Sequence, residues 1–180
     1  MNHLDIIDYW FSDRIAKHWF SSTPGLDDEI RNTFEPTWAS AAKGELDTWK
    51  STPEGCLALI IILDQFPLNM FRGKAKSFQT ESRAIEITMA AIGNGFDKEL
   101  SADKLAFLFM PLMHSEHPGD QDLSVELFKK HNLSGNLRFA RHHRDIVRKF
   151  GRFPHRNRIL GRESTKEELE YLASEDAFKG

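Results

Sequence analysis

The chain has little that could stabilise it apart from its own core. Its 180 residues include one cysteine, Cys56, so no disulfide can form within the chain and a reducing, cytoplasmic setting is expected. Cys56 opens the longest apolar run, residues 56–63, where a packed thiol fits better than a nucleophile. A membrane helix needs about 20 apolar residues, and the N-terminal segment has acids where a secretory signal has bases. We therefore expect neither a membrane partner nor export.

Familiar active-site motifs are also missing. The sequence has no GxxxxGK[ST] loop, no GxGxxG after a strand and no GxSxG elbow, which leaves nucleotide-binding and serine-hydrolase folds unsupported. His114, Glu116 and His117 are neighbours, but HSEH has neither the HExxH spacing nor a Cys/His ligand set. The His-Asp dipeptide of one class of helical metal phosphohydrolase is absent as well. We predict no metal site and no cofactor.

Charge is low overall but unevenly distributed. The net charge is −3, which argues against general nucleic-acid binding. Residues 138–162 hold nine bases and one acid, whereas the rest of the chain holds fifteen bases and twenty-six acids. This basic segment either docks on the acidic surface of its own protein or forms an anion site.

Apolar residues recur with the helical period along the whole chain, and nothing in it separates two domains. We predict one all-helical domain spanning residues 1–180. Ile60 to Ile62 are β-branched, but no other segment offers a partner strand, so helix is preferred there. We expect roughly eight helices, arranged in antiparallel pairs, and a short helical turn at 154–160. The expected helices span residues 4–11, 27–44, 53–66, 80–92, 102–117, 120–130 and 134–151, and a last helix is capped by Ser164 or Thr165.

Several polar side chains fall on apolar helix faces. His143 lies in the apolar stripe of helix 134–151, Glu116 and His114 end helix 102–117, and Asp64 follows the most apolar run. Groups placed in this way either pair inside the protein or form functional sites with shifted pKa values. The turn at 150–162 adds glycines, a proline and donors: Arg152, His155, Arg156, Asn157 and Arg162. It suits a bound phosphate or carboxylate, but arginine–carboxylate contacts that only hold the fold together would use the same residues.

Three segments carry these polar residues: Leu63-Asp-Gln-Phe-Pro67, Pro111-Leu-Met-His-Ser-Glu116, and Phe150-Gly-Arg-Phe-Pro-His-Arg-Asn157 followed by Leu160-Gly-Arg162. This set resembles the bacterial family known as domain of unknown function 924, nearly end to end. The resemblance implies an all-helical, tetratricopeptide-like fold and no particular activity. The polar residues that match it are Asp64, Gln65, Asn69, Arg72, His114, Ser115, Glu116, His143, Arg152, His155, Arg156, Asn157 and Arg162. Leu68 departs from the family, which usually has arginine after Phe-Pro.

Two main hypotheses for function follow. In the first, the three segments form an internal pocket for a small anionic metabolite, where His143 or His155 moves protons and Glu116 or Asp64 orients the imidazole. The ligand contacts would come from Arg72, His114, Arg152, Arg156, Asn157 and Arg162. In the second, the protein is a tetratricopeptide-like module for a protein or peptide partner, and the polar cluster is structural. RNA contact through the basic segment is a weaker third idea.

Overall fold

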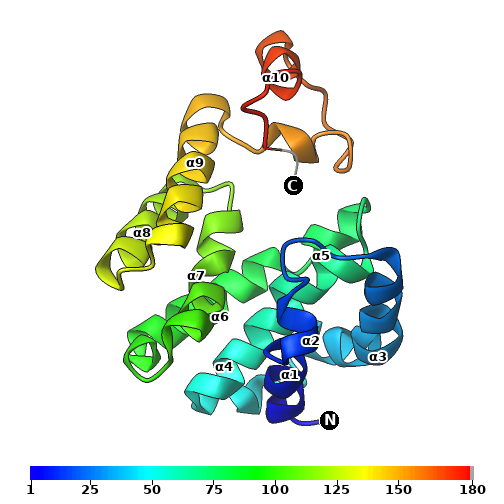
Figure 1. Ribbon diagram of the computed structural model, residues 1–180, viewed down its shortest axis with the longest axis vertical. Helices are drawn as coiled ribbons and strands as arrows, with labels where there is room; N and C mark the ends of the chain where they lie inside the picture. The colour runs from blue at the N-terminus through cyan, green and yellow to red at the C-terminus, as the bar shows by residue number, and fades with distance from the viewer. Residues whose placement is uncertain (179–180) are drawn as a thin grey trace.

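The computed structural model describes residues 1–178, in which helices and tight helical turns provide all the regular structure. The predicted all-α class is confirmed, and Figure 1 shows the helices arranged as a curved array. The α-helices are α1 (His3–Trp10), α2 (Asp13–Ala16), α3 (Pro24–Ala42), α4 (Pro53–Ile60), α5 (Phe66–Met70), α6 (Glu81–Gly93), α7 (Ala102–His114), α8 (Pro118–Lys130), α9 (Ser134–Phe150) and α10 (Lys166–Leu172). Short turns are η1 (Asp47–Ser51), η2 (Ile61–Gln65), η3 (Ala75–Phe78), η4 (Phe96–Lys98) and η5 (Pro154–Arg156).

The observed helix ends differ from the prediction where capping side chains decide them. Helix α3 begins three residues earlier than expected, because Thr23 accepts a hydrogen bond from the Leu26 amide and proline occupies the first helical position. Thr80 precedes α6 but does not cap it, since its hydroxyl donates to the Leu63 carbonyl at 2.6 Å instead. The short helix α2 was not predicted.

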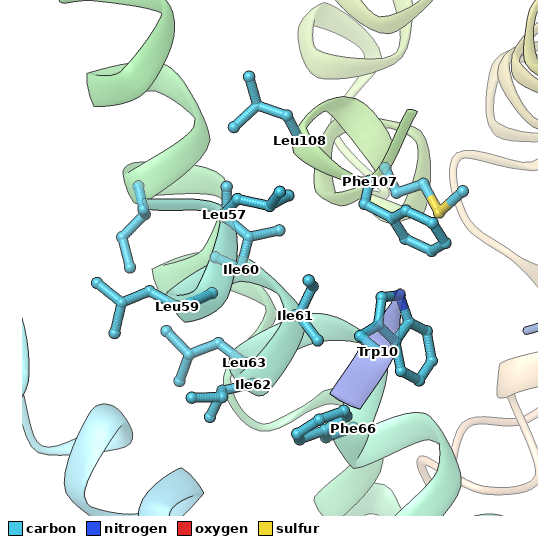
Figure 2. Close-up of a cluster of buried hydrophobic side chains, with 14 of the residues drawn as sticks. Trp10, Leu57, Leu59, Ile60, Ile61, Ile62, Leu63, Phe66, Phe107 and Leu108 are labelled. Atoms are coloured by element: carbon cyan, nitrogen blue, oxygen red, sulfur yellow. The ribbon is translucent and has the colours of Figure 1, made fainter. Parts of the chain in front are cut away.

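The most buried element is a helix running from Pro53 to Met70, here called the central helix. It consists of α4, the π turn η2 and α5, so it continues past the predicted end near Phe66. Every residue from Cys56 to Leu63 is at most 1% exposed, and each buried Leu or Ile side chain contributes about 1.5–3 kcal/mol. Figure 2 shows these residues packed with aromatic rings from α1 and α7. The apolar run therefore forms the middle of the core.

Helices α7, α8 and α9 pack in sequence against one another on one side of the molecule (Figure 1). Helix α7 ends at His114, three residues earlier than predicted, because Ser115 adopts extended backbone angles. The side chain of Gln121 on α8 then donates to the carbonyls of Met113 and Ser115 at 2.7 and 2.6 Å. This corner fixes the positions of the two polar residues beside it, His114 and Glu116.

After α9 the chain continues through η5 and α10, which lie at the top of the view in Figure 1, next to the end of α9. Residues 151–178 are called the C-terminal arm. The arm has its own small apolar cluster, in which Phe153 packs with Ile146 and Val147 of α9, and Phe150, Tyr171 and Phe178 lie around them. Its ion pairs with residues 1–150 join Arg156 to Glu81 and Arg162 to Glu116. In residues 1–178, no helix combines the length and the apolar composition needed to cross a membrane.

Candidate functional site

Asp64 lies inside the π turn of the central helix and is 5% exposed. A π turn inserts an extra residue into a helical turn and is frequently found at functional sites. The neighbouring Gln65 donates its side-chain amide to Asp64 at 2.6 Å. A buried carboxylate needs further partners, because removing a charge from water is costly.

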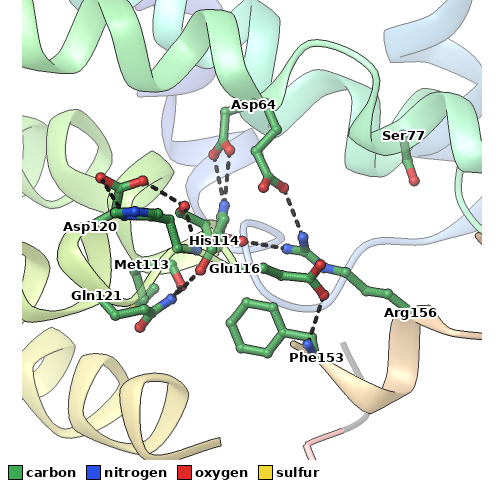
Figure 3. A network of polar contacts seen from close by, with 12 residues as sticks. Asp64, Ser77, Met113, His114, Glu116, Asp120, Gln121, Phe153 and Arg156 are labelled. Atoms are coloured by element: carbon green, nitrogen blue, oxygen red, sulfur yellow. Dashed lines mark hydrogen bonds and ion pairs between the residues drawn. The ribbon is translucent and has the colours of Figure 1, made fainter. Parts of the chain in front are cut away.

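His114 provides that partner from the end of α7. Its Nδ1 is 3.0 Å from each carboxylate oxygen of Asp64, and Figure 3 shows the imidazole facing the carboxylate. Burial lowers the pKa of His114, but the charge of Asp64 and the hydrogen bond to it outweigh burial, so the pKa is raised. The His114 side chain is 17% exposed. In this pair the buried carboxylate of Asp64 fixes the orientation of the His114 imidazole through Nδ1.

Arg156 brings the C-terminal arm to the same place. Its guanidinium donates to Glu81 at 2.9 Å and to the His114 carbonyl at 2.8 Å, and it lies 4.5 and 4.7 Å from the rings of Phe78 and Phe153. The residue is 6% exposed, and its Nε–H is buried without a hydrogen-bond partner. Burial raises the pKa of Glu81, and the charge of Arg156 only partly offsets this effect.

Glu116 is held by a second arginine of the arm. Arg162 donates to both carboxylate oxygens at 2.6 and 2.9 Å, and the Phe153 amide donates to one of them at 2.7 Å. Burial raises the pKa of Glu116, but these donors outweigh it and leave the pKa lowered. Glu116 therefore joins the loop after α7 to the arm, and Figure 3 shows its contact with the Phe153 amide.

A third ion pair lies within the arm. Arg152 donates to both oxygens of Glu168 at 2.7 and 2.9 Å, and Asn157 donates to the same carboxylate at 3.1 Å. Arg152 is the largest influence on Glu168, and together with the Thr165 amide it lowers the pKa to about 2. Arg162 in turn donates to Asn157 at 2.9 Å. Arg152, Arg156 and Arg162 of this turn are thus each paired with a carboxylate.

His143 and His155 lie close to one another but differ from His114. Nδ1 of His143 is 2.8 Å from the Phe139 carbonyl, and both imidazoles pack against the ring of Phe153. Burial is the main cause that lowers the pKa of His143 to about 3 and that of His155 to about 4. The charge of His114 contributes to both shifts. Both imidazoles are neutral at pH 7.

Comparison with known proteins assigns the chain to a family. The family model described as "Bacterial protein of unknown function (DUF924)" matches residues 6–176. The chain belongs to the DUF924 family. The solved structure of a protein of unknown function from Agrobacterium tumefaciens is 40% identical over 95% of this chain and 96% of that one, with a TM-score of 0.90. No curated protein matches this chain. The predicted membership is confirmed. The family and the solved structure are both described as having unknown function.

The three segments singled out in the sequence do come together, but with partners that were not predicted. Asp64 orients His114 rather than His143 or His155. Glu81, at the start of α6, and Glu168, on α10, neutralise two of the arginines, and no sequence pattern marks either carboxylate as a partner. Arg72 stands apart from the cluster, because its guanidinium binds Asp27 at 2.7 and 3.2 Å.

Two hollows are lined by residues other than Asp64 and His114. One, of about 290 Å³, is lined mainly by apolar residues, including Trp19, Phe20, Phe107 and Met110. The other, of about 320 Å³, lies between α9 and α10 and is more polar. Within residues 1–178 no three His, Cys, Asp or Glu side chains are grouped closely enough to hold a metal.

Proposed function

We propose that DUF924 proteins of this type bind a small anionic molecule beside His114, and that the Asp64–His114 pair acts on it as a general acid–base. The observation that carries the proposal is the buried Asp64 carboxylate, which holds the imidazole through Nδ1. A carboxylate in this position selects the tautomer and leaves Nε2 for proton transfer. Nε2 makes no hydrogen bond with any described residue, and the His114 side chain is partly exposed.

Burial lowers the pKa of His114, but the charge of Asp64 and the hydrogen bond to it outweigh burial and raise the pKa. This imidazole therefore takes up a proton more readily than an ordinary histidine, which suits a general acid–base group. The π turn is a second supporting feature. It places Asp64 within the most apolar helix of the protein, where a carboxylate has a stability cost, and such turns are enriched at functional sites.

Arg156 indicates the class of ligand. A buried, unpartnered N–H calls for an acceptor, and the Nε–H of Arg156 is such a donor within this cluster. A carboxylate or phosphate oxygen would satisfy it. Glu81 has a raised pKa and His114 takes up a proton readily, so the negative charge of a ligand can be matched by a proton on either group.

The other arginines have a different role in this proposal. Arg152 and Arg162 are fully engaged with Glu168 and Glu116, so they position the arm and leave the ligand to Arg156. His143 and His155 line the site as neutral side chains and do not transfer protons. Only Asp64 of the predicted catalytic set keeps its assigned task of orienting an imidazole, and that imidazole is His114.

Binding of inorganic phosphate and of malonate, measured by calorimetry and by the ring NMR signals of His114, tests the proposal. We expect the signals of His114 to shift on binding, and affinity to rise as the pH is lowered from 8 to 6. A probe at about 100 times its dissociation constant adds roughly 2.7 kcal/mol, which raises the melting temperature by roughly 5–10 °C.

The same substitution made inside and outside the cluster tests whether the probe binds at the proposed site. Arg156→Lys, which removes the Nε–H donor and the planar fork, should weaken binding at least tenfold. Arg72→Lys makes the same change outside the cluster and should leave affinity within twofold. Unchanged binding in Arg156→Lys and His114→Gln, or no response to either probe or to a set of phosphorylated and carboxylated metabolites, would contradict the proposal.

A second candidate function is a module for a protein partner, and one observation favours it. Phe20 is 78% exposed beside the apolar hollow formed with Trp19 and Phe107, and exposed apolar patches mark interaction sites. In this alternative the arginine–carboxylate pairs only hold the arm in place. Phe20→Ser would then abolish capture of a partner while leaving phosphate binding unchanged.

A further inference from the structure

The last described residues fold back over the histidines beside the proposed site. After α10 the chain turns, and the ring of Phe178 lies 4.4 Å from that of His143 and 4.9 Å from that of His155, centroid to centroid. His142 lies further away, at 6.5 Å. The histidines belong to α9 and to the segment η5, so a single side chain covers imidazoles from two elements.

The attachment of this tail is light. The Phe178 amide donates to the Tyr171 hydroxyl at 2.9 Å, and the Ala177 amide donates to the Ser174 carbonyl at 3.4 Å. Residues Ala173 to Asp176 are partly or fully exposed, and no ion pair among the described residues involves them. By contrast, the preceding helix is fixed by the buried Glu168. The tail can therefore move while α10 stays docked.

We propose that residues 173–178 form a displaceable plug whose Phe178 ring occupies the binding place of an aromatic ring on the ligand. The proposal rests on the function proposed above and narrows its ligand to a molecule that carries both an aromatic ring and an acidic group. The Phe178 ring meets the two neutral imidazoles at an angle, 60° at His143 and 85° at His155. Edge-to-face contacts of this kind favour an aromatic partner. The anionic group of the same molecule would reach the neighbouring His114 and Arg156.

The covered histidines are linked to the proposed site through Phe153, whose ring packs against both imidazoles and lies 4.7 Å from the guanidinium of Arg156. The groups that act on His143 are His142 on its own helix, His114 on α7 and His155 on the arm. His155 is affected by Arg156, Glu116, His114 and Arg162. Burial is the main cause that keeps both imidazoles uncharged, and the charges of nearby groups such as Arg156 and His114 add to it. The two imidazoles are therefore suited to an apolar ring.

The test compares full-length Phe178→Ala with wild type, using 3-phenylpropionate as the probe and calorimetry as the measurement. We expect the variant to bind at least tenfold more tightly, because the probe no longer has to displace a ring. Burial lowers the pKa of His143 to about 3 and that of His155 to about 4, so the ring NMR signals of both should titrate at higher pH in the variant than in wild type. Leu169→Ala, which truncates a 57% exposed side chain on α10, is the matched control and should bind like wild type.

A milder variant gives a second measurement. Tyr171→Phe removes the acceptor for the Phe178 amide while keeping the aromatic ring, and a net hydrogen bond of this kind corresponds to a roughly 2- to 10-fold gain in affinity. Equal or weaker binding of 3-phenylpropionate by both variants would overturn the plug, as would unchanged histidine titrations.

Failure of the plug can be told from failure of the proposed function. In one outcome, wild type binds inorganic phosphate, His114→Gln does not, and Phe178→Ala shows no gain in 3-phenylpropionate binding. This result overturns the plug but not the proposed function. A gain in Phe178→Ala that persists in the double variant Phe178→Ala/His114→Gln supports the plug and overturns the role of the acid–base pair.

Discussion

The central helix and the C-terminal arm are held in place by different forces. Seven consecutive apolar side chains of the central helix, residues 57–63, are at most 1% exposed, and they make no use of charge. The arm has a small apolar cluster and is joined to the other helices by two arginine–carboxylate pairs, Arg156–Glu81 and Arg162–Glu116. The comparison indicates that the body is stable through apolar burial, whereas the position of the arm is set by directional contacts.

Truncating an aromatic ring of the core should have the largest effect. Phe107 is 1% exposed and packs against Trp10, Phe11 and Trp19. Phe107→Ala should lower the free energy of unfolding by about 3–5 kcal/mol, because it removes apolar burial and leaves a cavity. Chemical denaturation measures this loss. Phe20→Ala, at a 78% exposed ring, should change stability by less than about 0.5 kcal/mol; similar losses at both sites would contradict the comparison.

Acid should destabilise the region around the arm. The folded pKa of His143 is about 3, below its ordinary value of 6.5. The unfolded chain therefore binds more protons between these values, and stability is lost as the pH falls through that window. For His143 the loss of folding free energy is on the order of 4 kcal/mol by pH 3. The pKa values of His155 and Glu168 are also lowered, so their contributions to folding stability are lost in overlapping acidic ranges. His114, whose pKa is raised, acts in the opposite sense, because its contribution is lost as the pH rises.

Denaturation curves between pH 7 and pH 3 measure this dependence. His143→Phe keeps a ring in the cluster but cannot take up a proton, so it should flatten the curve. A wild-type slope that survives in His143→Phe would show that other groups control acid sensitivity.

Breaking one ion pair of the arm should have an intermediate effect. Glu116→Gln leaves the part-buried Arg162 without its carboxylate and should cost about 2 kcal/mol. We also expect faster proteolytic cleavage within residues 158–164, because the arm would detach before the body unfolds. Glu116→Met combined with Arg162→Met removes both charges and should recover much of the loss. If the double variant is less stable than Glu116→Gln, the pair contributes more than positioning.

A surface ion pair should have the smallest effect. Arg148 and Asp122 join α9 to α8 at 2.6 Å, but both side chains are 53% exposed. Asp122→Asn should change the free energy of unfolding by less than about 0.5 kcal/mol, since solvent screens the pair. Thermal denaturation at low and high salt measures this change. A loss as large as that of Glu116→Gln would mean that burial does not decide which pairs matter.

The helices could be predicted because their signals are local. Period-3.6 spacing and capping residues lie within a few positions of the backbone that they organise, as at Thr165, which caps α10. The start of α3 was missed although its cap, Thr23, is local, but two other errors occurred where a distant partner decides. Thr80 resembles an N-cap, but its hydroxyl bonds to Leu63, and the end of α7 is set at the corner with α8.

The candidate site was partly predictable for the same reason. Asp64, His114 and Glu116 stand out because a polar residue on an apolar helix face must have a partner. The sequence does not say which partner. Glu81 lies 75 positions from Arg156, and Phe178 reaches His143 only because α10 turns the chain back. Such pairings depend on how helices are stacked.

By itself the sequence determined that this protein is helical, that the apolar run 56–63 lies at the centre, and which polar residues lie on apolar helix faces away from water. Each of these properties follows from hydrophobic spacing and from the cost of burying an unpaired group. Only the tertiary structure decided that Asp64 holds His114 and that carboxylates pair with Arg152, Arg156 and Arg162 of the arm. Charges and rings interact over a few ångströms in space, and that proximity is created by helix packing rather than by neighbourhood in the chain.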